Sequence, residues 1–278
     1  MKEIAIYIKE RFPLPLVLFL ALGYGFFIIG ISLTHGAFET TALLIALVTL
    51  SFTGFLLRQR ITDEFKDNEH DATNYPHRPV QRGLVTKKQL IALGLVALGV
   101  ELFSIFLIGG APALAWYIPF FIYSLLMAKE FFMPAWLNRH FTLYFVLHQC
   151  IFIFCLIWSF GFLGTPLTMQ TVLLATAFIL ALASIEIIRK FKIRHNSKGV
   201  VVADTYPAVW GTRGSMYVLV SLILAMGVLL SIGTSSFIPL AISASSLFGI
   251  SLSRQNTRAI QVIGSVHFIT QAIVVVVL

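Results

Sequence analysis

The chain has 278 residues, of which 58% are hydrophobic and only 12% are charged, and its mean hydropathy is +0.90. These values exclude a soluble globular domain and indicate an integral membrane protein in contact with lipid. The net charge of +8 is typical of nucleic-acid binding in a soluble protein. In a membrane protein it is explained by the Lys and Arg residues that keep loops cytoplasmic, so we expect no nucleic-acid partner.

The apolar residues occur in uninterrupted runs, which favours membrane-spanning helices over the alternating pattern of a β-barrel. We predict an all-α polytopic membrane protein with a single domain over residues 1–278. Nine transmembrane segments are expected, at residues 13–34, 40–57, 88–109, 113–127, 141–162, 168–188, 215–232, 237–252 and 259–278.

Nine crossings place the loops alternately on two faces, and the charges test this count. All 20 Lys and Arg residues fall on the face of the N-terminus, whereas the loops of the other face carry Glu39 as their one charge. By the positive-inside rule the basic face is cytoplasmic. We therefore expect a bacterial or archaeal inner (plasma) membrane protein whose charged loops face the cytosol.

One cytoplasmic stretch, residues 57–85, sets five acidic residues among basic ones. If the preceding helix continues through it, Asp63, Asp67 and Asp71 recur every four residues on one face, with Glu64 beside them. Carboxylates so close together repel one another unless a cation lies among them. Hard divalent cations such as Mg²⁺ take oxygen ligands and complete their shell with water and substrate phosphates. The stretch therefore predicts a Mg²⁺ site that binds a phosphate.

Arg78 and Arg82 follow the acidic residues, with Pro79 and Gly83 between and after them. Guanidinium groups bind phosphate oxygens in a fixed geometry, so these arginines are candidates for the anion. A solvated juxtamembrane loop of mixed charge is the alternative. The helical period of the acidic residues argues against it.

The same residues carry a resemblance to a known family. The stretch 63–71, DEFKDNEHD, resembles the acidic motif N-D-x-x-D-x-x-x-D of the UbiA superfamily of intramembrane prenyltransferases, and RPVQRG at 78–83 is similar to the family's N-R-P-[IL]-x-x-G. Asp63 stands where the family has Asn, Glu64 where it has Asp, and His77 replaces a second Asn. The resemblance implies a helical bundle around a central cavity.

The loop after residue 188 repeats the arrangement of acids, bases, Pro and Gly. Its TYPAVWG at 205–211 resembles the T-L-P-V-x-x-G that follows the family's second acidic motif. The expected second Asp-x-x-x-Asp is missing, and Glu186 and Asp204 are the nearest acids. Either a second metal is held by fewer acids, or neighbouring bases such as Arg189 and Lys190 neutralise the diphosphate directly. Interfacial anchoring is the alternative for these two bases.

Two polar residues lie inside the apolar segments. Glu101, near the middle of the third segment, must face a partner or a cavity, either as a general base for an acceptor or as a protonated packing residue. His148, in the cytoplasmic half of the fifth segment, is a candidate catalytic residue, with an interhelical hydrogen bond as the alternative. The aromatic loop 127–140 is interpreted as a lid over the site or as a membrane anchor.

The resemblance implies Mg²⁺-assisted loss of diphosphate from an isoprenyl diphosphate, followed by transfer of the prenyl group to an aromatic or lipid-like acceptor. A transmembrane terpene cyclase of the same superfamily, which needs no acceptor, is the alternative. A transporter is disfavoured because the charges gather at one face. The expected roles are catalytic for Asp63, Asp67, Glu101 and His148, diphosphate-binding for Arg78, Arg82, Arg189, Lys190, Lys198 and Tyr206, and metal-binding for Asp63, Glu64, Asp67, Asp71, Glu186 and Asp204.

Overall fold

The computed structural model describes residues 2–33, 42–253 and 256–278. Glu39, the one charge expected in the opposite loops, lies outside the described residues. The helices are α1 (Lys2–Arg11), α2 (Leu14–Leu33), α3 (Ala42–Lys66), α4 (Asn68–Asn74), α5 (Lys87–Ala128), the 3₁₀ turn η1 (Glu130–Phe132), α6 (Pro134–Arg139), α7 (Phe141–Gln149), α8 (Ile151–Leu163), α9 (Met169–Arg189), α10 (Tyr206–Thr234), α11 (Ile238–Leu252) and α12 (Thr257–Val277). Strands β1 (Arg194–His195) and β2 (Val201–Val202) form a short hairpin.

The described chain contains seven helical stretches that are long and apolar enough to cross a membrane, with α7 and α8 counted as one, and α11 is a shorter apolar helix. The predicted all-α, polytopic membrane architecture is therefore confirmed. Each of the nine predicted segments lies on one of these helices, and the third and fourth both lie on α5.

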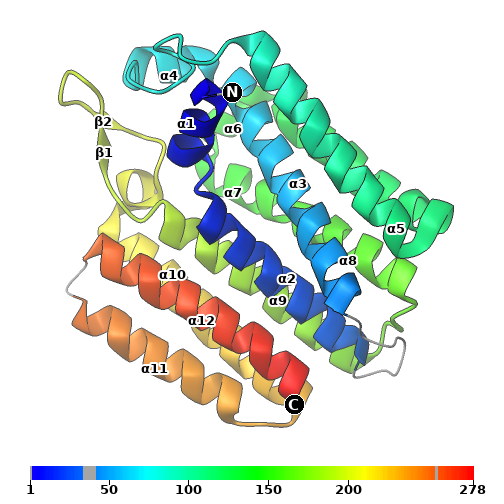
Figure 1. Ribbon diagram of the computed structural model, residues 1–278. Helices are drawn as coiled ribbons and strands as arrows, with labels where there is room; N and C mark the ends of the chain where they lie inside the picture. Colours follow the sequence, from blue (N-terminus) through cyan, green and yellow to red (C-terminus); the bar gives the residue numbers. More distant parts are fainter. Residues whose placement is uncertain (1, 34–41, 254–255) are drawn as a thin grey trace. The chain divides into compact units, whose positions relative to one another are not determined.

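Helix α5 reverses its direction at Gly109–Gly110 (Figure 1). Gly110 has φ of 60°, a conformation that glycine adopts without a steric penalty. Tyr117 donates a hydrogen bond to Glu101, although 16 residues of straight helix would separate the two by about 24 Å. The reversal coincides with the predicted boundary between the third and fourth segments.

The chain divides into two compact units, each built from several stretches of sequence. Unit 1 comprises Met1–Gly25, Thr41–Trp158 and His195–Val200, and unit 2 comprises Phe26–Thr40, Ser159–Arg194 and Val201–Leu278. Helices α2 and α8 contribute residues to both. Each unit is described by itself below.

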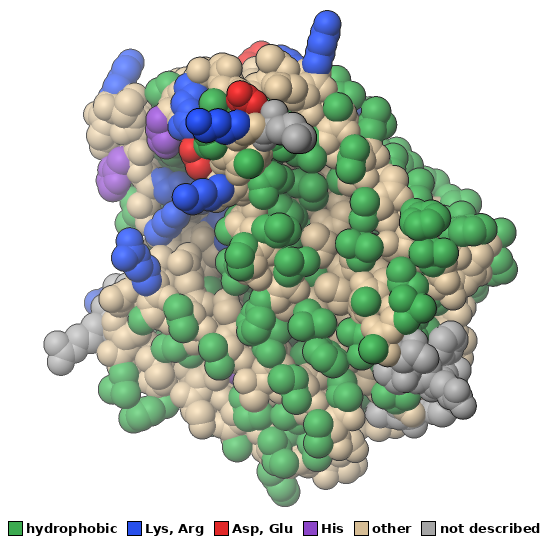
Figure 2. Space-filling view, viewed as in Figure 1, with side chains coloured by type: hydrophobic (Ala, Val, Ile, Leu, Met, Phe, Trp, Pro, Cys, Tyr) green, Lys and Arg blue, Asp and Glu red, His purple; other side chains and the backbone are tan. Residues whose placement is uncertain are grey.

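Unit 1 is organised around the packing of α3 against α5, which run side by side in Figure 1. Aromatic rings fill its interior: Tyr24 stacks on Phe52 with ring centroids 4.1 Å apart, and Phe55 lies 4.7 Å from Phe120. Figure 2 shows charged side chains gathered over α1 and α4, whereas hydrophobic side chains cover the visible face of α5. The surface charges visible on this face of unit 1 thus gather at one end of an apolar helical body.

Unit 2 is formed mainly by four helices. Helix α10 packs against α9 and α11, and α12 packs against the same two helices. Phe27 of α2 packs against Phe178 of α9 with ring centroids 4.8 Å apart. Gln271 of α12 donates to the carbonyl of Pro239 in α11 at 2.8 Å, and His267 pairs with Ser246 at 2.9 Å. Polar side chains therefore join α12 to α11, as is common between transmembrane helices.

Gly54 marks the closest approach of α3 to α5, and replacing it tests this packing. A Cβ at this position would lie 2.9 Å from the backbone oxygen of Ala97 and 3.1 Å from Glu101, and a backbone oxygen cannot move aside cheaply. We expect Gly54→Ala to lower the stability by about 1–3 kcal/mol through overpacking. Thermal unfolding in detergent measures the effect.

The matched control is Gly99→Ala, because a Cβ at Gly99 on α5 meets nothing within 4 Å. There the gain in helix propensity, about 1 kcal/mol, should leave the midpoint temperature of unfolding equal to or above that of the wild type. Equal midpoints for the two variants would contradict the close packing of α3 on α5.

Candidate functional site

The first acidic motif lies in unit 1, at the end of α3 and in the short helix α4. The backbone N–H of Asp67 bonds to the carbonyl of Asp63 at 2.8 Å, and that of Asp71 bonds to Asp67 at 2.8 Å. The turn at Asp67 departs from ideal helix, with φ of −92° and ψ of 10°. The i to i−4 bonding nevertheless continues through the motif, as the spacing predicts.

Glu64 and Asp71 are buried and are bound by arginines. Glu64 has a side-chain exposure of 0% and accepts hydrogen bonds from Arg60 at 2.6 Å and from Arg11 at 2.8 Å. Asp71 is 3% exposed and lies 3.5 Å from Arg11, and it forms a close ion pair with Arg78. Both carboxylates therefore act as anchors for bases in this structure.

Asp63 and Asp67 differ from these two because their side chains are accessible, at 42% and 43%. The ammonium of Lys66 lies 3.5 Å from Asp63 and 4.0 Å from Asp67, and Arg60 reaches Asp63 at 4.0 Å. Two carboxylates on successive helical turns thus remain open to a ligand.

A third carboxylate approaches the same ammonium from the loop after α5. Glu130 is buried, and its side chain lies 3.8 Å from Lys66. Glu130, Phe131 and Phe132 all have positive φ values, of 46°, 53° and 59°. Such conformations are costly for residues with a side chain and persist where surrounding contacts impose them. The loop 127–140 therefore contributes a charge to the site, which was not among its predicted roles as lid or anchor.

Helix α1 is docked on this motif. Tyr7 is buried in a cluster with Ile61, Val85 and Leu90, and Arg11 at the end of the helix reaches Glu64 and Asp71, as described above. Glu10 accepts a hydrogen bond from Arg82 at 2.8 Å. The N-terminal helix is thus part of the charged end of unit 1.

The environments shift the pKa values of two of the carboxyl groups. Burial alone would raise the pKa of Asp71, but hydrogen bonds from His70 and Arg78 and the charge of Arg11 hold it below its usual value. Partial burial raises the pKa of Asp67, and the nearby Asp63 and Asp71 add to this while Lys66 opposes it. Asp67 therefore ionises less readily than Asp71, and an added cation would stabilise its ionised form.

The predicted diphosphate ligands of unit 1 are already engaged. Arg78 lies over the ring of Tyr75 at 3.8 Å as well as against Asp71, whereas Arg82 is 40% exposed and pairs with Glu10. Lys198 is exposed at the tip of the β1–β2 hairpin, where Asn196 donates to Asn74 at 3.4 Å. Arg82 and Lys198 are thus the accessible cations of this set.

The second predicted cluster lies in unit 2, at the end of α9 and the start of α10. Glu186 accepts from Arg189 at 2.7 Å and from Tyr206 at 3.3 Å, and Lys190 lies 3.1 Å away. Asp204 pairs with Arg194 at 3.1 Å. Each acid of this region is bound to bases, so the cluster has the chemistry of an anion site more than that of a metal site.

Glu101 is held in a buried polar network inside unit 1. Arg58 of α3 donates to its two oxygens at 2.8 and 3.1 Å, Tyr117 donates to it, and Ser124 accepts from Arg58 at 2.9 Å. Glu101 thus has the partner that its place inside an apolar segment requires. The carboxylate is oriented toward these groups and lies among packed aromatic side chains that leave no room for a water molecule between them.

His148 lies on α7 with Nδ1 2.8 Å from the carbonyl of Tyr144 on its own helix. Its ring stacks on that of Tyr144, with centroids 3.9 Å apart, and the hydroxyl of Tyr144 accepts from Lys66 at 3.2 Å. His148 is therefore linked to the acidic motif through Tyr144 and Lys66.

The fit of a metal ion rests on the Asp63–Asp67 pair. Within residues 2–33, 42–253 and 256–278, no three Asp, Glu, His or Cys side chains are arranged to hold a metal ion by themselves. Mg²⁺ is commonly bound by one or two carboxylates together with substrate phosphates. The accessible pair meets that requirement, and its nearest base, Lys66, lies 3.5 Å and 4.0 Å away. Glu64, Asp71, Glu186 and Asp204 are instead bound to bases at hydrogen-bond distance.

Several residues of the site were not singled out from the sequence. Lys66 had a local signal, since it follows Asp63 by three residues in a helix. Arg11 and Glu130 come from distant parts of the chain and gave none. Arg58 was assigned to a cytoplasmic loop, and the structure corrects this: it is a buried residue of α3.

Breaking the buried ion pair tests its role. Glu101→Ala leaves Arg58 charged and without its main partner inside the bundle, so we expect a loss of stability of about 3–5 kcal/mol. The double variant Arg58→Leu, Glu101→Leu removes both charges and should recover much of the loss. Unfolding in detergent measures the stability of both variants. Equal losses for the single and double variants would contradict the assignment of Glu101 as the partner that neutralises the buried Arg58.

The chain has relatives among solved structures. No family model and no curated protein matches the sequence. A structure of digeranylgeranylglyceryl phosphate synthase in membranes is 16% identical, with a TM-score of 0.57 over 100% of both chains. The apo structure of a UbiA homologue from Aeropyrum pernix K1 is 17% identical, with a TM-score of 0.59 over 93% of this chain and 98% of the other. The chain therefore shares the fold of these two structures, one of them a UbiA homologue, which is the fold that the resemblance in the two loops implies.

Proposed function

We propose that the protein catalyses Mg²⁺-dependent ionisation of an isoprenyl diphosphate within the membrane and transfers the prenyl group to an acceptor. The fold supports this reaction class, because one structural neighbour is a synthase of a prenylated lipid phosphate by its own description. The two loop motifs support it independently. The proposal assigns the site to the cytoplasmic side, where the sequence places all 20 Lys and Arg residues.

The observation that carries the proposal is the contrast among the carboxylates of the first motif. Arginines bind the buried Glu64 and Asp71, whereas Asp63 and Asp67 remain 42% and 43% exposed. A purely structural charge network has no need of two accessible carboxylates on successive turns. We assign Asp63 and Asp67 as the metal ligands and Glu64 and Asp71 as the groups that fix the surrounding arginines.

In this assignment Mg²⁺ supplies charge neutralisation for the leaving diphosphate. The protein's own residues bind and orient the anion. Arg82 and Lys198 are accessible donors of unit 1. Arg189, Lys190 and Tyr206, which surround Glu186, supply donors of unit 2. The bases near Glu186 are assigned an anion-binding role in unit 2, where the second acidic motif is missing.

The bundle provides the apolar surroundings that an allylic cation needs to escape capture by water. We propose nine membrane crossings, counting the two halves of α5 and the short α11, around a central cavity. Unit 1 carries an open apolar hollow of about 410 Å³ beside the α5 reversal, lined by Leu102, Leu114, Tyr117, Ile118 and Phe121 among others. This hollow opens on a membrane-spanning segment and suits an isoprenoid chain or a lipid tail.

The terpene cyclase is the second candidate, and the surroundings of Glu101 favour it. A prenyltransferase acting on a hydroxyl or aromatic acceptor uses a base to take the acceptor's proton. Glu101 has Arg58 on both oxygens and Tyr117 on one of them. His148 directs Nδ1 to a carbonyl of its own helix. Glu101 is thus held by its own partners and is not placed to take a proton from an acceptor.

The metal assignment is tested by Asp67→Asn, which keeps the shape and removes the charge. We expect Mg²⁺-dependent release of diphosphate from geranylgeranyl diphosphate to fall by about 10²–10³-fold, the usual cost of losing one electrostatic group. Glu69→Gln is the matched control, because Glu69 is exposed on the adjacent turn, and it should retain wild-type release. Unchanged release in Asp67→Asn would refute the assignment.

The two candidate reactions are separated by incubating the purified protein with geranyl, farnesyl and geranylgeranyl diphosphates without an acceptor. A cyclic hydrocarbon or alcohol identifies the cyclase. Intact diphosphate, consumed only after membrane lipid or an aromatic acceptor is added, identifies the transferase. Intact diphosphate under every condition would contradict both.

A further inference from the structure

Lys66 occupies the position among carboxylates where a divalent cation is expected. Its ammonium lies 3.5 Å from Asp63, 4.0 Å from Asp67 and 3.8 Å from Glu130. The side chain is only 12% exposed. A lysine within an acidic cluster is a point charge with three donors and no fixed geometry, so it can satisfy several oxygens at once.

Elements distant in the sequence hold Lys66 in place. Tyr144 of α7 accepts from its ammonium at 3.2 Å, and the ammonium also lies over the ring of Tyr144 at 5.6 Å. Glu130 reaches it from the turn η1, whose three residues all have positive φ. Positive φ values carry a conformational cost, and the turn that bears this cost places the buried carboxylate of Glu130 next to Lys66.

The charges around the motif nearly cancel. Five carboxylates form ion pairs with four bases there: the acids are Asp63, Glu64, Asp67, Asp71 and Glu130, and the bases are Arg11, Arg60, Lys66 and Arg78. Glu64 and Asp71 are each bound by arginines, so the charge that meets Asp63 and Asp67 is set largely by Lys66. A divalent cation approaching this pair is repelled by the ammonium as well as attracted by the carboxylates.

We propose that Lys66 is a resident cation of the acid pair, which competes with the divalent metal and yields to it when a diphosphate arrives. The ammonium then moves from the carboxylates to a phosphate oxygen, which its flexible four-carbon stem permits. This inference rests on the proposed function and deepens it. The protein binds the metal and the diphosphate together, and Asp63 and Asp67 bind the metal only weakly when the diphosphate is absent.

The test is equilibrium binding of Mn²⁺ to the purified protein in detergent, followed by electron paramagnetic resonance with and without inorganic pyrophosphate. Lys66→Met removes the charge and keeps the length of the side chain. We expect it to bind Mn²⁺ without pyrophosphate at least about tenfold more tightly than the wild type, since one repulsive charge is lost a few ångströms away. The enhancement of Mn²⁺ binding by pyrophosphate should shrink. A misfolded variant would lose Mn²⁺ binding, so a gain is specific.

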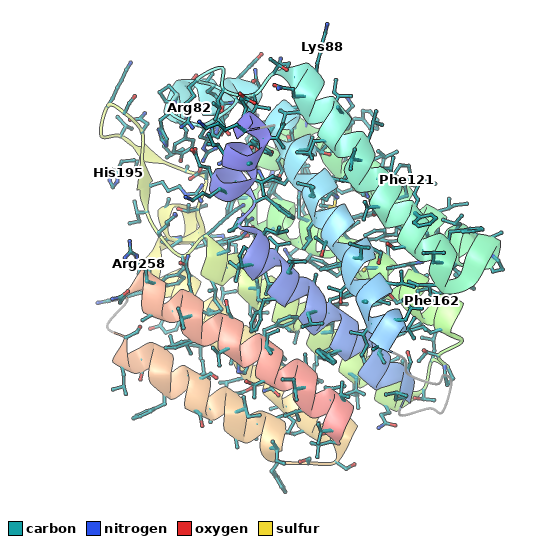
Figure 3. The ribbon with its side chains drawn as sticks, viewed as in Figure 1. Arg82, Lys88, Phe121, Phe162, His195 and Arg258 are labelled. Carbon is teal, nitrogen blue, oxygen red and sulfur yellow. The ribbon has the colours of Figure 1, made fainter. Side chains whose placement is uncertain are left out.

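Two controls bracket this result. Lys66→Arg keeps the charge and should bind Mn²⁺ as the wild type does. Lys88→Met removes a lysine that points away from the other helices of unit 1 (Figure 3) and should also leave Mn²⁺ binding unchanged. An equal gain in Lys88→Met would reduce the effect to net charge and overturn the proposal.

Glu130→Gln gives a change of opposite sign and covers the case in which Lys66→Met does not fold. Without Glu130, Asp63 and Asp67 are the carboxylates left to hold the ammonium, together with the hydroxyl of Tyr144, so Mn²⁺ should bind more weakly than in the wild type. Unchanged or weaker Mn²⁺ binding in a folded Lys66→Met, or unchanged binding in Glu130→Gln, would overturn the role of Lys66.

The failure of this inference is distinguishable from the failure of the proposed function. Asp67→Asn measured in the same assay with pyrophosphate should lose Mn²⁺ binding. If it does while Lys66→Met behaves as the wild type, the metal assignment stands and the role of Lys66 is wrong. If Asp67→Asn binds Mn²⁺ normally, the metal is not held by this pair and both are wrong.

Discussion

The structure depends on the pairing of carboxylates with bases at the end of an apolar helix. An unpaired carboxylate buried beside a membrane-spanning segment is costly, so each buried acid of the motif has a guanidinium partner. Arg60 and Arg11 hold Glu64, and Arg78 holds Asp71. Because these pairs fix the helix end, the remaining acids can stay accessible. Buried, arginine-bound carboxylates and accessible carboxylates thus lie within nine residues of sequence.

The body that carries this end has its own polar constraint. Arg58 and Glu101 join α3 to the first half of α5, and Tyr117 and Ser124 join the same network from the second half. The reversal at Gly109–Gly110 is what brings these halves together. A buried network of this kind specifies one register of α3 against α5, because a shifted register would leave charges unpaired. The position of the acidic motif relative to α5 follows from that register.

The sequence predicted what depends on local pattern. Apolar runs placed the helices and the break between the third and fourth segments, and the four-residue spacing placed Asp63, Asp67 and Asp71 on continuous helical bonding. The sequence could not show which carboxylates are buried, because this depends in part on Arg11, which is far away along the chain. The pairing of Arg58 with Glu101, 43 residues apart, is equally invisible to local spacing. The predicted metal ligands of the second loop remain a prediction, and in unit 2 their partners are bases.

The central claim is that Asp63 and Asp67 bind a divalent metal together with a diphosphate. Anomalous scattering from Mn²⁺ in crystals grown with pyrophosphate tests it most directly. We expect a peak between the carboxylates of Asp63 and Asp67, with pyrophosphate oxygens in its shell. A metal peak away from this pair, or a peak at the pair with no pyrophosphate oxygen in its shell, would contradict the claim.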